Sequence, residues 1–127
     1  MAMATVRRRV RWILLGADDS WGATLATSRI ALTALAMLAL LLHALDLATG
    51  VRMMLVYGIH MEQNPIARYL MATGGPLQLA GVKLVVVMFG VLLFMRTARA
   101  GRPRLARNCL LLAAGIGLLG FASNMVG

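Results

Sequence analysis

Charged residues are scarce in this chain, and the scarcity decides its class. They make up 13% of its 127 residues, whereas 61% are hydrophobic; ordinary soluble domains carry about 25% charged residues. At about 20 residues per crossing, the length allows at most about four transmembrane helices and no separate soluble domain. This balance excludes a large soluble enzyme and predicts an integral membrane protein.

Cysteine and acidic residues are also rare. Cys109 is the only cysteine, which excludes a disulfide within the chain. Asp46 is the only aspartate inside an apolar run, so one chain cannot build a pair of catalytic aspartates in the membrane. The motifs H-E-x-x-H, G-x-S-x-G and the P-loop are missing. We therefore predict no catalytic residue, no metal site and no cofactor, with an intramembrane enzyme kept as an alternative.

Three long apolar runs predict three transmembrane helices. A fourth stretch, Val10–Ser28, holds adjacent Asp18 and Asp19, and each carboxylate would cost about 2.5–3.5 kcal/mol in hydrocarbon. We expect that stretch to stay outside the hydrocarbon. The predicted fold is all-α, with a segment 1–28 followed by a membrane domain 29–127 whose spans cover about residues 30–50, 77–96 and 108–126.

The N-terminal segment 1–28 has the pattern of a basic amphipathic helix. Its apolar residues Val6, Val10, Ile13 and Leu14 share one helical face, while the neighbouring arginines point elsewhere. Such a helix is expected to lie flat on the inner leaflet. A cleaved signal peptide is not favoured, because the apolar core after Trp12 ends within four residues.

The arginines predict the direction of the spans. Ten of the thirteen basic residues flank the start of the first span or lie between the second and third, whereas the loop 51–76 carries only Arg52 and Arg68. By the positive-inside rule, the N-terminus and the loop 97–107 are cytoplasmic, and the loop 51–76 and the C-terminus are external, in the inner membrane. The arginines are expected to meet anionic lipid head groups rather than nucleic acid.

Ionisable residues near the predicted outer ends of the spans need partners. If the first helix ends at Gly50, Asp46 lies about 6 Å inside it, and Lys83 lies about 10 Å beyond Pro76 in the second span. A lone charge in hydrocarbon is costly, so Lys83 should pair with Asp46 or Glu62. The candidates for this ligand or ion-pair cluster are His43, Asp46, Glu62, Asn64 and Lys83. The cluster is either a structural ion pair or a site for an ion or polar ligand.

The external loop contains a helix-start signal. Asn64 can cap free backbone N–H groups, and Pro65 suits the first helical position. Gly74 and Gly75 can end the helix. We predict a short interfacial helix from Pro65 to Thr73, whose N-terminal dipole favours nearby carboxylates.

Small residues form a stripe on the third span. The spacing of these residues keeps them on one narrow face, and small residues let helix backbones approach closely. The predicted packing face comprises Ala113, Gly117, Gly120 and Asn124. Its partner is a helix of the same chain, a second copy in a homo-oligomer or a larger membrane protein.

A combination of motifs gives the chain a resemblance to a known family. Three features occur together. They are Asp46 and Thr49 close to a helix end, the pattern G-x-x-x-E-x-N-P from Gly58 to Pro65, and Lys83 in the next helix. The chain resembles, over about residues 43–94, a family of small prokaryotic membrane proteins known only as a domain of unknown function. The resemblance implies a membrane location and groups Asp46, Glu62, Asn64 and Lys83 as one unit, without an activity.

These observations favour a small interaction or accessory subunit of the membrane, with a polar cluster in the outer leaflet. The alternative is an oligomeric transporter, or a membrane protein that binds an ion or a small polar ligand. A pore within one chain is disfavoured, because the inner halves of the spans, such as 34–42 and 85–95, are apolar.

The predicted topology can be tested by cysteine labelling in intact cells. Single cysteines placed in 51–75 should react with a membrane-impermeant reagent, and those in 96–107 should react only after the membrane is opened. External labelling within 96–107 would overturn the topology.

Overall fold

The structure is a computed structural model that describes residues 27–126, and within this range every regular element is helical. Helix α3 spans Arg29–Tyr57, the short 3-10 helix η1 spans Ile59–Met61, α4 spans Pro65–Arg99 and α5 spans Pro103–Val126. The predicted amphipathic helix within 1–28 falls almost entirely on residues outside the described range.

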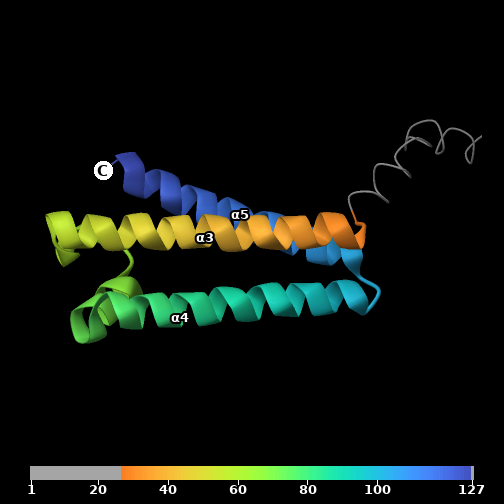
Figure 1. The fold of residues 1–127 in the computed structure, drawn as a ribbon, viewed down its shortest axis with the longest axis horizontal. Coiled ribbons are helices and arrows are strands. Elements are labelled where there is room, and N and C mark those ends of the chain that lie inside the picture. The colour runs from red at the N-terminus through yellow and green to blue at the C-terminus, as the bar shows by residue number, and fades with distance from the viewer. Residues whose placement is uncertain (1–26, 127) are drawn as a thin grey trace, which may run out of the picture.

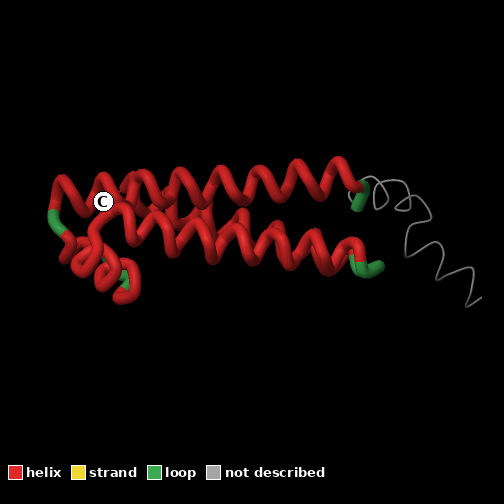
Figure 2. Tube along the Cα trace, turned by 60° about the horizontal axis from the view of Figure 1, so that its bottom comes forward, coloured by secondary structure: helices red, strands yellow, loops and turns green. Residues whose placement is uncertain are grey.

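The three long helices lie side by side (Figure 1). Helices α3 and α5 run in the same direction and α4 runs in the opposite one, so α5 ends toward the end of the bundle where α3 ends. The most extensive packing is between α3 and α5. The connecting segments are confined to the two ends of the bundle (Figure 2).

Helix α3 is longer than the sequence predicted. It begins at Arg29 and is capped by Ser28, whose side chain accepts a hydrogen bond from Ala31 N at 3.2 Å. It continues seven residues past Gly50 to Tyr57. The expectation that Gly50 ends the helix is wrong. Gly58 supplies the stop, because its φ of 101° suits glycine and its N–H bonds to Met54 O. Asp46 therefore lies about 16 Å, not 6 Å, from the end of its helix.

The predicted interfacial helix is present as the first part of α4. Asn64 Oδ1 accepts a hydrogen bond from Ile66 N at 3.0 Å, and Pro65 occupies the first turn, as expected. Gly75 breaks the helix with φ 67° and ψ −165°, and Pro76 follows at once. The short helix thus runs into the membrane-spanning part of α4 through a kink rather than a loop.

The connection between α4 and α5 is shorter than the predicted loop 97–107. Helix α4 continues to Arg99 and α5 starts at Pro103, so only residues 100–102 link them. Proline fits the first turn of a helix because it has no N–H to leave unpaired. Most of the arginines in this region therefore lie on helix ends.

Two apolar clusters hold the bundle. Leu32, Ala36, Val91 and Leu110 form one cluster toward the arginine-rich end. Met54, Met71 and Leu79 form the other, where the first part of α4 packs on α3. Asp46 and Lys83 lie between these clusters along their helices, so the polar site is bounded by apolar packing on both sides.

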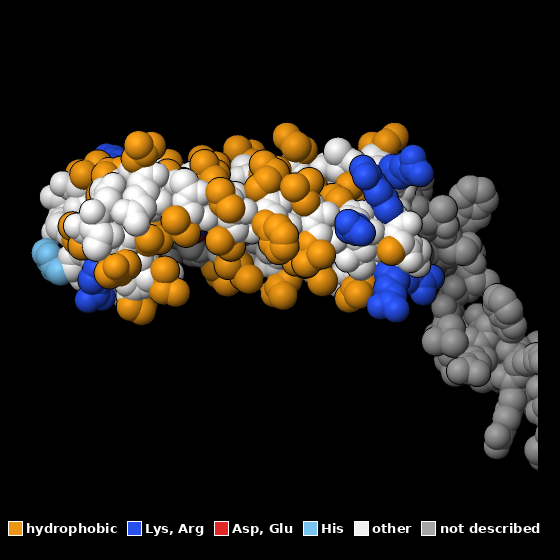
Figure 3. All heavy atoms as spheres, turned by 90° about the horizontal axis from the view of Figure 1, so that it is seen from below, with side chains coloured by type: hydrophobic (Ala, Val, Ile, Leu, Met, Phe, Trp, Pro, Cys, Tyr) orange, Lys and Arg blue, Asp and Glu red, His pale blue; other side chains and the backbone are white. Residues whose placement is uncertain are grey.

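The fold class predicted from the sequence is confirmed. Helices α3, α4 and α5 are each long and apolar enough to cross a membrane. Most of their large apolar side chains face outward along the middle of the molecule (Figure 3), where lipid would solvate them. The chain is a multi-pass membrane protein.

Two glycines of α5 provide a matched test of the packing between α3 and α5. A Cβ on Gly117 would lie 3.0 Å from His43 N and 3.1 Å from the carbonyl carbon of Leu42, whereas a Cβ on Gly115 would meet nothing within 4 Å. We expect Gly117→Ala to lower the free energy of unfolding by about 1–3 kcal/mol. Gly115→Ala should leave it unchanged or raise it by up to about 1 kcal/mol. Unfolding in mixed micelles followed by circular dichroism measures both, and equal effects would contradict the packing.

Candidate functional site

An ion pair joins α3 to α4. Lys83 Nζ lies 2.6 Å from Asp46 Oδ2. The Asp46 side chain is 15% exposed and that of Lys83 is 29% exposed, so both charges are largely withdrawn from the surface. Each charge in such a position needs the other, because a single buried charge is expensive.

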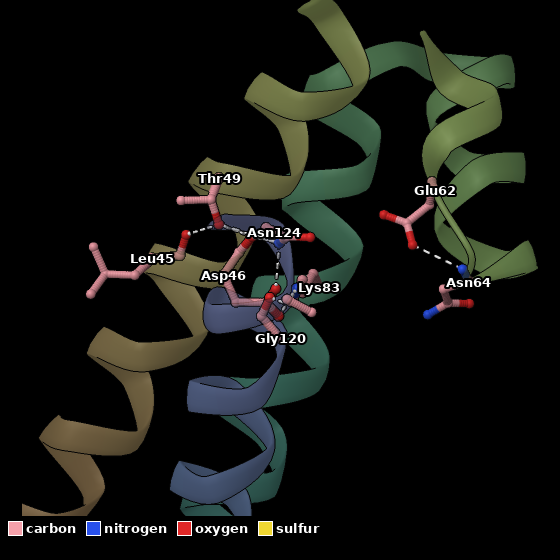
Figure 4. A network of polar contacts seen from close by, with 9 residues as sticks. Leu45, Asp46, Thr49, Glu62, Asn64, Lys83, Gly120 and Asn124 are labelled. Atoms are coloured by element: carbon pink, nitrogen blue, oxygen red, sulfur yellow. Dashed lines mark hydrogen bonds and ion pairs between the residues drawn. The ribbon is translucent and has the colours of Figure 1, made fainter. Parts of the chain in front are cut away.

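Asn124 brings α5 to the same aspartate. Its Nδ2 donates to Asp46 Oδ1 at 3.0 Å, to Asp46 O at 3.1 Å and to Thr49 Oγ1 at 3.2 Å. Thr49 Oγ1 in turn donates to the backbone oxygens of Leu45 or Asp46. Both carboxylate oxygens of Asp46 therefore have a donor, and three helices meet at one side chain (Figure 4).

Glycines let α5 approach this aspartate. A Cβ on Gly120 would lie 2.5 Å from Asp46 Cγ, and a Cβ on Gly50 would lie 3.2 Å from Asn124 Nδ2. In the predicted packing face, Gly117 and Gly120 contact α3 in this way, Asn124 hydrogen-bonds to α3, and Ala113 is half-buried. The predicted packing face of α5 therefore packs against α3 of the same chain.

Glu62 and Asn64 lie on a separate arm, formed by η1 and the start of α4. Glu62 Oε1 accepts a hydrogen bond from Asn64 N at 2.8 Å, and Glu62 O accepts from Arg68 Nη2 at 2.7 Å. Among the described residues, the only ion pair is Asp46 with Lys83. The structure therefore does not bring Glu62 into the ion pair, because local bonds hold the arm away from Lys83.

A cavity of about 510 Å³ lies between this arm and the three helices. All five cluster candidates line it, joined by Ser123 and Asn124. The other lining residues are mainly aliphatic, among them Leu47, Val51, Met54, Leu70, Leu79 and Val82. The cavity thus combines an apolar wall with charged groups from both sides.

His43 contributes an unpaired nitrogen to this region. Its Nδ1 is buried and has no hydrogen-bond partner within the described part of the chain. His60 is exposed on η1 and does not line the cavity. Within residues 27–126, no group of three or more His, Cys, Asp or Glu side chains is placed to hold a metal ion.

The sequence does not predict three contributors to the site. Gly50 resembles a helix end in the sequence, although it shares a helix face with His43 and Asp46, a spacing of the same kind as that of the stripe on α5. Arg68 and Ser123 carry no motif that marks them, although their hydrogen bonds are local: Arg68 donates to Glu62 O and Ser123 donates to Gly120 O.

Fold and site together define a three-span membrane protein with an ion pair linking its helices beside a mixed polar and apolar cavity. Residues 28–126 match the family described as Domain of unknown function (DUF5658), and the chain belongs to that family. No curated protein and no solved structure matches the chain.

Coupling between Asp46 and Lys83 can be measured with a double-mutant cycle. Lys83→Met leaves the Asp46 carboxylate without its cation and should destabilise the protein by about 3 kcal/mol. Lys83→Met combined with Asp46→Asn should recover most of this loss. Arg52→Met, which removes an exposed cation from α3, is the control and should change little. Additive losses in the cycle, measured by unfolding in micelles, would show that the two side chains do not interact.

Proposed function

We propose that this protein binds a small ligand in the cavity between the arm and the three helices. The observation that carries the proposal is the cavity itself, with its volume of about 510 Å³ and its charged side chains set in an aliphatic wall. Ligand sites in proteins occupy about 300–1,000 Å³ and combine apolar walls with a few placed polar groups. This is the ligand-binding alternative raised by the sequence.

The position of the arginines supports an orientation in the inner membrane. Six arginines lie at one end of the bundle, on helix ends or in the turn between α4 and α5. They are Arg29, Arg96, Arg99, Arg102, Arg104 and Arg107. Basic side chains gather at that end in Figure 3. We place this end in the cytoplasm, against anionic lipid head groups, and the cavity toward the outer face.

Binding suits the geometry better than conduction through one chain. Between the cavity and the arginine-rich end, the described helices meet through the apolar cluster of Leu32, Ala36, Val91 and Leu110. A polar solute in the cavity has no hydrophilic path through this cluster. The accessory-subunit role and a homo-oligomer stay predictions, since the outward apolar side chains suit lipid as well as a partner helix.

Two alanines at the start of α4 offer a matched test. Ala67 lines the cavity, whereas Ala72 is exposed and does not. Ala67→Phe should fill part of the cavity, and Ala72→Phe adds the same side chain outside it. The probes are four compact cyclohexyl compounds: cyclohexylmethylammonium, its N-trimethyl derivative, cyclohexylmethanol and cyclohexanecarboxylate.

We expect at least one probe to bind the full chain in lipid nanodiscs, and Ala67→Phe to weaken that binding about tenfold or more, since a filled site excludes the probe. Ala72→Phe should bind as the unmodified chain does. Calorimetry corrected for uptake by empty nanodiscs measures this. Absence of binding by every probe, or equal binding by the two variants, would contradict the proposed function.

A further inference from the structure

The charges that line the cavity do not balance. Among residues 27–126, the negative side chains that line it are Asp46 and Glu62 and the positive one is Lys83, which leaves one negative charge with histidine counted as neutral. Lys83 and Asp46 neutralise each other at 2.6 Å, and Asn124 donates to the second oxygen of Asp46. The surplus charge therefore belongs to Glu62.

Glu62 has capacity for another donor. Its Oε1 accepts one hydrogen bond from Asn64 N, and its Oε2 has no partner within residues 27–126. The nearby Arg68 donates to the backbone oxygen of Glu62 instead of its carboxylate. Figure 4 shows the Glu62 carboxylate on the side of the arm that faces α3 and α5. A carboxylate with a free oxygen thus faces a half-apolar cavity.

The remaining lining limits what can complement this carboxylate. Among residues 27–126, no Phe, Tyr or Trp side chain lines the cavity, so these residues offer a cation no such ring to stack on, as quaternary ammonium groups commonly require. A positive group must instead donate hydrogen bonds to the carboxylate, which are stronger than bonds between neutral groups. The aliphatic residues opposite can cover an apolar body.

The size of the cavity and the kinds of side chain around it do not suit a bare metal ion. The volume of about 510 Å³ far exceeds one ion, and the described residues provide no set of three or more metal-binding side chains. Together with the surplus charge and the aliphatic wall, these features favour an organic molecule over a metal ion.

We propose that the ligand is a monovalent organic cation that carries N–H groups, such as a primary ammonium or an amidinium, on a compact apolar body. Its N–H groups donate to Glu62, and its body packs against Leu47, Val51, Leu79 and Val82. The Asp46–Lys83 pair forms the polar wall and is not displaced. This inference rests on the proposed function and specifies the class of ligand.

The charge series of cyclohexyl probes tests the inference. In nanodiscs, cyclohexylmethylammonium should bind the full chain about tenfold or more tightly than cyclohexylmethanol, and more tightly than the trimethyl derivative or cyclohexanecarboxylate. Glu62→Gln keeps the shape of the side chain and an acceptor for Asn64 N. It should abolish the preference for ammonium and leave the affinity for cyclohexylmethanol within about twofold.

A charge-relocation control separates Glu62 from the overall charge of the protein. Gln63 is exposed and does not line the cavity, so Glu62→Gln with Gln63→Glu keeps the net charge and moves the carboxylate outside. The preference should stay lost in this double variant. Circular dichroism should confirm equal helicity in every variant.

The outcomes distinguish the two proposals. The ligand class would be overturned if the alcohol, the carboxylate or the trimethylammonium probe bound as tightly as the primary ammonium probe. If Ala67→Phe still weakened that binding, the cavity would remain a binding site. An ammonium preference that survives Glu62→Gln would also overturn the ligand class. Absence of binding by every probe would overturn both.

Discussion

The pairing of Lys83 with Asp46 constrains the rest of this structure. A lysine within an apolar span stays charged at tolerable cost only beside a carboxylate, and that carboxylate comes from α3 at 2.6 Å. The remaining oxygen of Asp46 is met by Asn124 of α5, which requires α5 to come close. Gly117 and Gly120 permit that approach, because a Cβ on Gly120 would overlap the Asp46 carboxyl group and a Cβ on Gly117 would press on the backbone of α3. One charge in α4 thus fixes the relation of three helices.

The same pairing determines what the cavity can offer a ligand. Because Asp46 and Lys83 satisfy each other, they provide a polar but neutral wall, and the unbalanced negative charge of the described lining residues lies on Glu62. The arm that carries Glu62 is held by its own bonds, through the Asn64 cap and Arg68, and is joined to the spanning part of α4 by the kink at Gly75. In the proposed function, Asp46 therefore holds the helices together and Glu62 binds the ligand.

Much of this fold could be predicted from the sequence, because long apolar runs and short capping motifs are local signals. The three spans, the Asn64 cap and Pro65 at a helix start follow from residues close together in the chain. The end of α3 could not be placed, since a glycine that stops a helix and one that packs against a side chain look alike; Gly50 packs against Asn124 and Gly58 stops the helix. The separation of Glu62 from Lys83 and the cavity between them depend on contacts between distant segments, which spacing alone does not specify.

The distance between Lys83 and Asp46 in a lipid bilayer tests the central claim most directly. Lys83 is the only lysine of the chain, so ¹⁵N-lysine labelling reports one side-chain nitrogen, and ¹³C-labelled aspartate supplies the carboxylate carbons. Solid-state NMR should detect a dipolar coupling between Lys83 Nζ and one aspartate Cγ, corresponding to the 2.6 Å contact of nitrogen and oxygen, and Asp46→Asn should remove it. Absence of the coupling in the unmodified protein, or its persistence in Asp46→Asn, would contradict the account.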